Sequence, residues 1–125
     1  MSQFLIDTNV FSKVFGNNLS VKEFIEGLDA VIDATVYIEC LQGSKANHEK
    51  RVIEKYLHKF PLLPITPTTS AKAIALIRNY SNSHGLLLPD ALIAATALEN
   101  DLVVVTYNVN DFKFIDGLKY QRPSV

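Results

Sequence analysis

The strongest contrast between apolar and polar positions lies between residues 88 and 105. Pro89 suits the first turn of a helix, and the apolar run that follows it predicts a helix buried on most of its sides. Residues 102–105 are largely β-branched, which is typical of a parallel strand covered on both faces. This stretch therefore predicts a helix followed directly by a strand.

Weaker patterns of the same two kinds fill the rest of the chain. Short apolar runs predict strands at residues 4–6, 30–33 and 61–65, with a last short strand between 112 and 120. Prolines flank the third of these strands, so we expect it to be short or to lie near an edge of the sheet. Apolar residues at helical spacing predict helices at residues 10–15, 20–28, 35–43, 47–60 and 70–80.

The helix starts are predicted from side chains that can cap a first turn. The predicted caps are Ser20, Thr35, Asn47 and Ser70. The polar residues 81–85 predict a mobile loop before the buried helix. Alternating strands and helices predict an α/β fold with a central parallel sheet and helices on both faces. Right-handed crossovers then bring the carboxyl ends of the strands to one edge.

Composition and charge mainly exclude classes of protein. A chain of 125 residues predicts one domain, residues 1–125, with a core that needs no disulfide or structural metal. No apolar run approaches the roughly 20 residues that span a bilayer, and no signal pattern is evident, so we expect a cytoplasmic protein without membrane contact. The only cysteine, Cys40, is expected to be a packing residue. With a net charge of -1, any nucleic acid must be held locally.

Four acidic residues fall where this fold would bring chain segments together. Asp7 and Asp111 follow strands, whereas Glu39 and Asp90 lie near the starts of helices that can open onto the same edge. Ligands of open α/β sheets bind off the carboxyl ends of the strands, so we expect the four acids to share one crevice. Two plainer interpretations stay open, with Asp90 as a helix cap and Asn108 as a turn residue.

Four carboxylates in one crevice would repel each other unless cations compensate their charge. Hard oxygen ligands select Mg²⁺ or Mn²⁺, and such a site suits the hydrolysis of phosphodiester bonds. Other chemistries lack their motifs: the sequence has no glycine-rich nucleotide loop, no GxSxG elbow and no Cys/His cluster for zinc. A haloacid-dehalogenase-type phosphatase would need an Asp where Asn9 stands.

Four segments, taken in order, resemble those of PIN-domain ribonucleases, in particular the small VapC-type toxins of bacterial toxin–antitoxin pairs. They are Phe4-Leu5-Ile6-Asp7-Thr8-Asn9, then Glu39 with Leu41 and Gly43, then residues 89–97, and finally Thr106-x-Asn108-x-x-Asp111-Phe112. The resemblance covers nearly the whole chain. It implies a three-layer α/β/α fold, Mg²⁺- or Mn²⁺-dependent cleavage of RNA, a VapB-like antitoxin as partner and frequent homodimers.

The same resemblance assigns roles to individual residues. Asp7, Glu39 and Asp90 match the three acids of the metal site, and Thr8, Asn9 and Thr106 match the polar residues beside them. Thr35, one turn before Glu39 on the same helix face, is expected in the site wall. Many PIN domains carry a fourth acid where this chain has Asn108. Either Asp111 takes the place of that acid or Asp111 is a turn residue, and both interpretations stay open.

Our leading hypothesis is a metal-dependent endoribonuclease in which Asp7 and Asp90 hold the ion, Glu39 orients or deprotonates water, and Asp111 or Asn108 completes the shell. One alternative is a PIN-like binding module with weak or no nuclease activity, and another is a Mg²⁺-dependent phosphatase. Short N-terminal helices could offer an antitoxin a groove, although core packing explains the same apolar residues: Phe11, Val14, Phe15, Phe24 and Leu28. The basic residues between 45 and 59 form a solvated helix face or a contact for phosphates.

Overall fold

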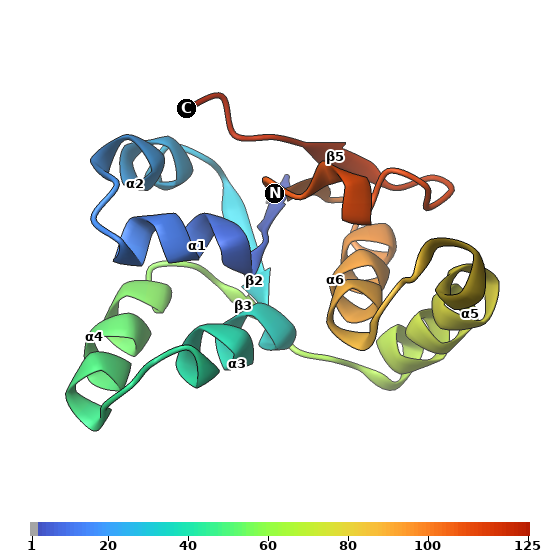
Figure 1. The fold of residues 1–125 in the computed structure, drawn as a ribbon, viewed down its shortest axis with the longest axis horizontal. Coiled ribbons are helices and arrows are strands. Elements are labelled where there is room, and N and C mark those ends of the chain that lie inside the picture. Colours follow the sequence, from blue (N-terminus) through green and yellow to red (C-terminus); the bar gives the residue numbers. More distant parts are fainter. Residues whose placement is uncertain (1–2) are drawn as a thin grey trace.

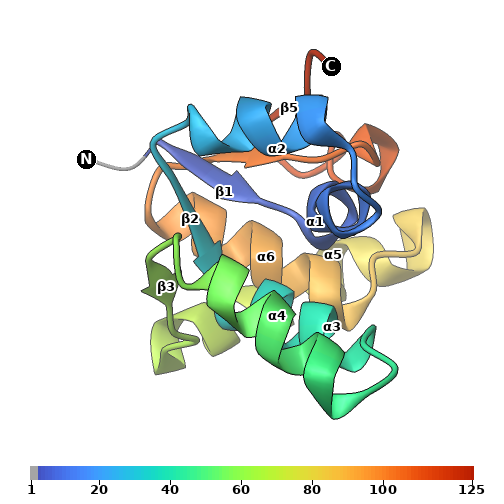
Figure 2. The same cartoon turned by 90° about the vertical axis from the view of Figure 1, so that its left-hand side faces the viewer.

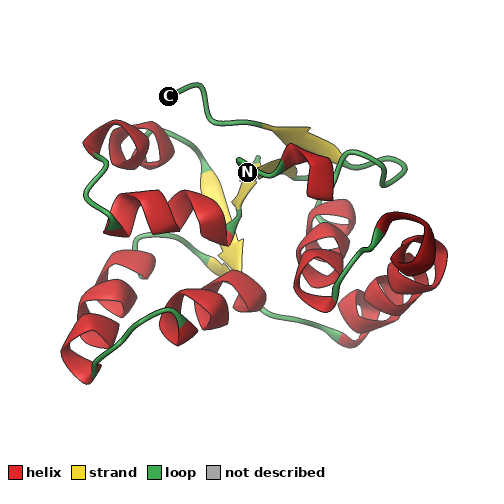
Figure 3. Ribbon diagram, in the orientation of Figure 1, coloured by secondary structure: helices red, strands yellow, loops and turns green. Residues whose placement is uncertain are grey.

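The computed structural model describes residues 3–125 as a sheet of five strands with six α-helices and one 3₁₀ turn (Figures 1 and 3). The strands are β1 (Phe4–Ile6), β2 (Ala30–Asp33), β3 (Leu62–Leu63), β4 (Val103–Val105) and β5 (Lys119–Gln121). The helices are α1 (Thr8–Phe15), α2 (Leu19–Glu26), α3 (Ala34–Gln42), α4 (Asn47–Leu57), α5 (Pro67–His84) and α6 (Leu88–Glu99), and the 3₁₀ turn is η1 (Val109–Asp111).

The strands pair in the order β3-β2-β1-β4-β5, and every pair is parallel. Figure 1 shows α1, α2 and α4 on one side of the sheet and α5 and α6 on the other. The predicted three-layer α/β/α fold is therefore confirmed. So is the edge position of the third strand, because β3 pairs with β2 alone.

The central strands are short and almost completely buried. Leu5 and Ile6 of β1 pair with Val104 and Val105 of β4, and none of these four side chains is exposed to solvent. Helix α6 packs beside them through alanines and Ile93, which are also fully buried. Small side chains let the helix approach the sheet closely, which agrees with the buried helix that the apolar run predicted.

The predicted helix caps are wrong. The N-cap residues of α2, α3, α4 and α5 lie one to four positions before the predicted caps and are Asn18, Asp33, Ala46 and Thr66, so Ser20, Thr35, Asn47 and Ser70 lie inside the first turns. The actual caps have extended backbones, which lets the side chains of three of them accept a backbone N–H of the first turn. The sequence offered several cap-forming residues near each start, and only the local backbone selects among them.

The predicted loop at residues 81–85 is also wrong in most of its length. Helix α5 continues to His84, and Gly85 ends it in a left-handed conformation with φ 72°. The Gly85 N–H donates to the carbonyl of Ser81 at 2.9 Å, which closes the last turn. The last strand, β5, lies at the end of the predicted interval. Within residues 3–125 no helix combines the length and apolar character needed to cross a bilayer.

Candidate active site

Two central strands deliver polar residues to the same edge of the sheet. Asp7 follows β1 and Thr106 follows β4, and the Asp7 N–H donates to the carbonyl of Val105 at 3.0 Å. Figure 2 shows the chain continuing from the arrowhead of β1 directly into α1. The parallel pairing of β1 with β4 thus brings together residues that are 99 positions apart in the chain.

The carboxylate of Asp7 is buried and held from three directions. Its Oδ1 accepts the Thr8 N–H at 2.7 Å, whereas its Oδ2 accepts the Thr106 hydroxyl at 2.9 Å and the Asn9 amide at 3.1 Å. The first of these bonds also caps α1. The orientation of Asp7 is therefore fixed before any ligand binds.

Asn9 joins the ends of the two strands. Its amide nitrogen also donates to the Thr106 hydroxyl at 3.0 Å, and its amide oxygen accepts the Tyr107 N–H at 3.0 Å. The Thr106 hydroxyl accepts the Asn108 N–H as well, at 3.0 Å. Asn9 and Thr106 thus act as supports for Asp7, as the resemblance implied for residues beside the acids.

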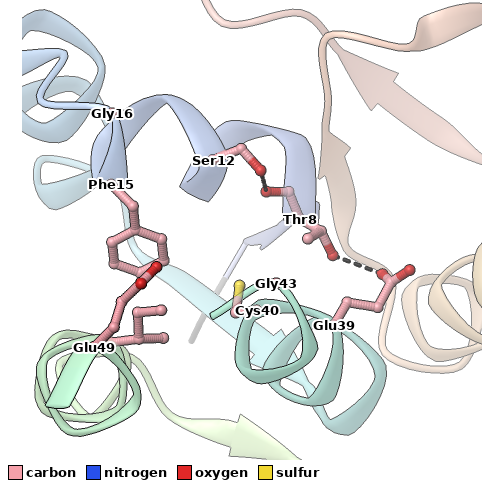
Figure 4. Close-up of a pocket in the computed structure, with 9 residues that line it drawn as sticks. Thr8, Ser12, Phe15, Gly16, Glu39, Cys40, Gly43 and Glu49 are labelled. Carbon is pink, nitrogen blue, oxygen red and sulfur yellow. Dashed lines mark hydrogen bonds between the residues drawn. The ribbon is translucent and has the colours of Figure 1, made fainter. Parts of the chain in front are cut away.

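Glu39 reaches the same place from α3, which starts directly after β2. Its Oε1 accepts the Thr8 hydroxyl at 2.7 Å, a bond that Figure 4 shows as a dashed line. Among the described residues no donor is bonded to Oε2. One oxygen of Glu39 is therefore positioned by the protein, while the other can accept a proton from a ligand.

The four predicted acids line one cavity of about 360 Å³. Its wall also contains predicted polar residues, and the complete lining is Asp7, Thr8, Asn9, Ser12, Glu39, Leu87, Pro89, Asp90, Asn108 and Asp111. Two predicted wall residues are not part of this lining. Thr106 is fully buried beneath Asp7, and Thr35 is buried with a hydroxyl that has no hydrogen-bond partner among the described residues. The structure therefore does not place Thr35 in the cavity wall.

A second cavity of about 270 Å³ shares Thr8, Ser12 and Glu39 with the first. It extends between α1 and α4 toward Phe15 and Glu49, as Figure 4 shows. Cys40 also lines it, and burial raises the pKa of its thiol to about 12, so the thiol stays protonated. This agrees with a packing role for the cysteine.

The acids of the four-acid cavity perturb one another electrostatically. Burial raises the pKa of Asp7 to about 6, against the lowering effect of its hydrogen bonds to Thr106 and Thr8. The pKa of Asp90 is raised to about 7, first by burial and then by the charges of Asp7, Asp111 and Glu39. The cavity therefore disfavours the accumulation of negative charge when no cation is present.

The two open interpretations of the cavity rim can now be compared with the geometry. Asp90 lies in the first turn of α6 and is not its cap, because the N-cap residue is Leu87. Asp111 belongs to the η1 turn and also lines the cavity, so the two roles considered for it are compatible. Asn108 lines the cavity too, while its backbone N–H is bonded to Thr106.

A divalent ion fits the donor set of this cavity. In residues 3–125 no group of three or more His, Cys, Asp and Glu side chains is arranged to enclose a metal ion by itself. Mg²⁺ does not require such a cage, since one or two carboxylates usually hold it together with waters and substrate phosphates. Carboxylate oxygens are hard ligands, and the raised pKa values of Asp7 and Asp90 indicate negative charge that lacks compensation.

Asp33 is a buried acid that the sequence reasoning treated only as a strand residue. Its Oδ1 accepts the Val36 N–H at 2.9 Å and caps α3, and its Oδ2 lies 3.5 Å from the Thr96 hydroxyl. Burial raises its pKa. Its position at the carboxyl end of β2, comparable to that of Asp7 just after β1, was the signal that could have identified it. Asp33 thereby fixes the start of the helix that carries Glu39.

Part of the apolar surface considered for a partner groove belongs to the core. Phe11 and Val14 are buried, whereas Phe15, Phe24 and Leu28 are partly buried and pack against the core. Phe15 also lines the second cavity. Core packing is therefore the correct interpretation for Phe11 and Val14, whereas Phe15 borders the second cavity and Leu28 borders another cavity between α2 and β3.

Comparison with known proteins agrees with this geometry. The model of the PIN domain family matches residues 4–118. Ribonuclease VapC10 of Mycobacterium tuberculosis is 36% identical over 80 residues, which are 63% of this chain and 60% of that protein, so the match spans three fifths of that relative. Ribonuclease VapC1 of Rickettsia felis is 31% identical over 123 residues, which are 92% of each protein.

A solved structure described as a toxin–antitoxin complex from Klebsiella pneumoniae superposes with a TM-score of 0.78 at 28% identity. The superposition covers 93% of this chain and 95% of that chain. The family match at residues 4–118 includes every acid of the cavity. This chain therefore belongs to the PIN-domain family.

Proposed function

We propose that this protein is a metal-dependent endoribonuclease and the toxin of a VapBC-type toxin–antitoxin pair. One observation carries the proposal: Asp7, Glu39, Asp90 and Asp111 line a single cavity in which burial and mutual repulsion raise the pKa values of Asp7 and Asp90. The names of the relatives VapC10 and VapC1, both ribonucleases, support the choice of RNA as the substrate.

Asp7 and Asp90 would hold Mg²⁺ or Mn²⁺, with Asp111 or Asn108 at the rim of the same cavity. When bound, such an ion supplies activation of the attacking water and stabilisation of the leaving oxygen. Asp7 is suited to this role because Thr8, Asn9 and Thr106 fix its orientation. Mutation of residues that orient a metal ligand typically lowers metal affinity or activity tenfold to a hundredfold, on the order of 1–3 kcal/mol.

Glu39 would orient the attacking water and take its proton. The Thr8 hydroxyl donates a hydrogen bond to Oε1, which orients the carboxylate, so Oε2 would be the oxygen that accepts the proton of the water. Glu39 lines the cavity together with Asp7 and Asp90, which puts the proton acceptor beside the proposed ion site. A general base is assigned first by its position relative to the proton that it takes, and the position of Glu39 in the cavity lining meets this condition.

The test is cleavage of single-stranded RNA by the purified protein with Mg²⁺ or Mn²⁺. We expect Asp7→Asn, Asp90→Asn and Glu39→Gln each to lower the rate by about a hundredfold or more, because each removes a group that acts in the transition state. Asp116→Asn is the matched control, since Asp116 is exposed and lies outside the cavity lining. Full activity of Asp7→Asn or Asp90→Asn would refute the assignment.

The same preparation distinguishes the alternative activities. A phosphatase would turn over a generic phosphomonoester faster than RNA, and a binding module would cleave neither. Faster hydrolysis of the phosphomonoester, abolished by Asp7→Asn, would replace the ribonuclease proposal with the phosphatase.

The proposed partner is a small antitoxin that covers the second cavity. The Klebsiella pneumoniae neighbour is described as a toxin–antitoxin complex, which supports this proposal. The cavity beside Glu39 offers both apolar and charged contacts, including Phe15 and Glu49. Co-expression with the product of a neighbouring short reading frame should yield a stable complex without ribonuclease activity. The homodimer that the family resemblance implied remains a prediction, and light scattering would test it by measuring the molar mass in solution.

A further inference from the structure

Two cations lie over one aromatic ring at the edge of the proposed active site. The Lys13 Nζ is 4.8 Å from the centre of the Tyr107 ring, and the guanidinium carbon of Arg122 is 5.1 Å from it. Both cationic side chains are exposed. Since both approach the same ring, their charges are separated by no more than about 10 Å, roughly one Debye length at 0.1 M salt.

This cation pair, Lys13 and Arg122, forms no ion pair among the described residues, although an oxygen of Val125 accepts the hydroxyl of the same Tyr107 ring at 3.2 Å. The ion pairs found between residues 3 and 125 join Lys59 to Glu26 and Lys119 to Asp101, and neither Lys13 nor Arg122 takes part in one. Two like charges held this closely repel each other, while the ring offsets only part of that repulsion. An anion that binds both cations would relieve it.

Backbone and side-chain hydrogen bonds attach the cation pair to the active site. Arg122 Nη1 donates to the carbonyl of Tyr107 at 2.7 Å, and the Tyr107 N–H donates to Asn9 Oδ1 at 3.0 Å. Asn9 in turn holds Asp7. Lys13 lies on α1, the helix that begins at Thr8. The guanidinium of Arg122 is therefore anchored relative to the four acids, and Lys13 approaches the same ring from an exposed position on α1.

An open cavity of about 610 Å³ lies between Arg122 and Asp111, one of the four acids. It is lined by Tyr107, Asn108, Val109, Asn110, Asp111 and Arg122. Asn108 and Asp111 line the four-acid cavity as well, so the two cavities meet at these residues. A chain-like ligand leaving the four-acid cavity across this border would pass directly to Arg122.

We propose that Lys13 and Arg122 bind a backbone phosphate of single-stranded RNA, on a nucleotide that flanks the one being cleaved. This inference rests on the proposed function and names how its substrate is held. An acidic cavity in a protein of net charge -1 repels RNA, so cations beside the cavity are required to bind the strand. Arg122 suits a phosphate, because its planar guanidinium presents several donors and only one is used by Tyr107.

The experiment measures binding of a fluorescent single-stranded oligoribonucleotide to the full chain carrying Asp7→Asn, which prevents cleavage. Adding Lys13→Gln and Arg122→Gln should raise the Kd roughly fivefold to thirtyfold. It should also reduce the slope of log K against log salt by about 0.7 for each phosphate that the protein no longer neutralises. Lys72→Gln with Lys113→Gln is the matched control, because it removes the same charge from exposed positions outside the three cavities.

In the otherwise unaltered chain, the same pair of substitutions should raise KM for a long oligoribonucleotide and leave kcat within about twofold. A dinucleotide has no flanking phosphate, so its cleavage should not change. Thermal unfolding checks that the exposed substitutions leave the fold intact. Arg122→Lys keeps the positive charge but lacks the planar, forked donors of the guanidinium, so it should give an intermediate Kd.

A Kd equal to that of the control variant would overturn the inference, as would loss of binding to an acidic partner polypeptide without loss of RNA binding. A different result would refute the proposed function. If the unaltered chain bound RNA through Lys13 and Arg122 but did not cleave it with either metal, the nuclease assignment would fall and the phosphate site would stand. Normal cleavage with unchanged KM in the pair variant would refute the phosphate site alone.

Discussion

The hydroxyl of Thr106 takes part in three hydrogen bonds of the site. It donates to Asp7 Oδ2 and accepts N–H groups of Asn9 and Asn108, which exhausts the bonding capacity of a hydroxyl. The side chain is completely buried, so water cannot replace any of these bonds. Loss of the hydroxyl would remove the bond of the Asn108 N–H and one of the two bonds that Asp7 Oδ2 accepts, leaving that oxygen with the Asn9 amide alone.

Thr106→Val keeps the shape of the side chain and removes these bonds. We expect it to lower the free energy of unfolding by about 1–3 kcal/mol, measured by urea denaturation. Thr68→Val is the control, because Thr68 is exposed on α5 and should change stability by less than about 0.5 kcal/mol. Equal effects of the two substitutions would show that the hydroxyl of Thr106 does not support the site.

Asp90 should make the metal-free protein less stable as pH rises. Its pKa is about 7 in the folded protein and 3.8 in the reference state, so between these values the folded state binds more protons than the unfolded state. The free energy of unfolding therefore falls as pH rises from about 4 to about 7. In Asp90→Asn this loss is absent.

We expect Asp90→Asn to stabilise the protein by about 1–2 kcal/mol at pH 8 in the presence of a chelator, a value discounted because the carboxylate is partly exposed. At pH 4.5 the gain should shrink severalfold. Urea titrations at the two pH values measure it. A gain that is equal at both values, or a loss at pH 8, would contradict the raised pKa.

The sequence predicted the acids of the site because each follows a strand or lies near the start of a helix. Asp7 and Asp90 stand next to strong apolar patterns, so their place in the fold could be inferred from local periodicity. Contacts such as Lys13 with Tyr107, or Arg122 with Tyr107, could not be predicted this way. They depend on the path of the C-terminal segment, which Figure 1 shows passing from β5 back toward the side that carries α1 and α2.

At the level of elements, helix caps account for most errors of the sequence reasoning. Several residues near each helix start could accept a backbone N–H, and their side chains have similar intrinsic preference for the role. Helix α5 illustrates this, because Thr66, Thr68, Thr69 and Ser70 all lie within five positions. Thr66 is the cap because it alone precedes Pro67 with an extended backbone, and it exchanges hydrogen bonds with Thr69.

This assignment predicts different costs for two similar substitutions in α5. Thr66→Ala removes the capping bond and should lower the free energy of unfolding by about 1 kcal/mol. Ser70→Ala removes a hydroxyl from an exposed position inside the helix and should change stability by less than about 0.5 kcal/mol. Thermal or urea unfolding compares them directly. A larger cost for Ser70→Ala would restore the cap that the sequence pattern predicted.

For the whole molecule, the arrangement of strands was more predictable than the site that it creates. Alternation of strands and helices implied a parallel sheet, and β1, β2 and β4 indeed end at one edge. The sequence predicted that Glu39 and Asp90 would share a crevice with Asp7, and the cavity lining agrees with this. The sequence did not show how α3 and α6 pack to form that cavity, because helix packing is not encoded in local periodicity. Burial of Asp33 under α3 is part of that packing.

If the four acids bind a divalent ion as proposed, the stability of the whole molecule should depend on that ion. An ion that binds the folded state alone stabilises it by about 2.7 kcal/mol at a concentration a hundred times its Kd. For a domain of this size, we expect Mn²⁺ or Mg²⁺ to raise the Tm by roughly 3 °C to 5 °C per kcal/mol at pH 8. Differential scanning calorimetry with and without the ion measures this shift.

Protonation should remove this stabilisation in a predictable range of pH. The ion requires ionised carboxylates, and Asp7 and Asp90 have pKa values of about 6 and about 7 without it. The apparent affinity should therefore fall by up to about a hundredfold per pH unit below pH 6, so the Tm shift should be lost near pH 5. Asp90→Asn should stabilise the metal-free protein yet abolish the shift at pH 8. A shift that persists in Asp90→Asn, or that persists unchanged at pH 5, would place the ion outside the four-acid cavity.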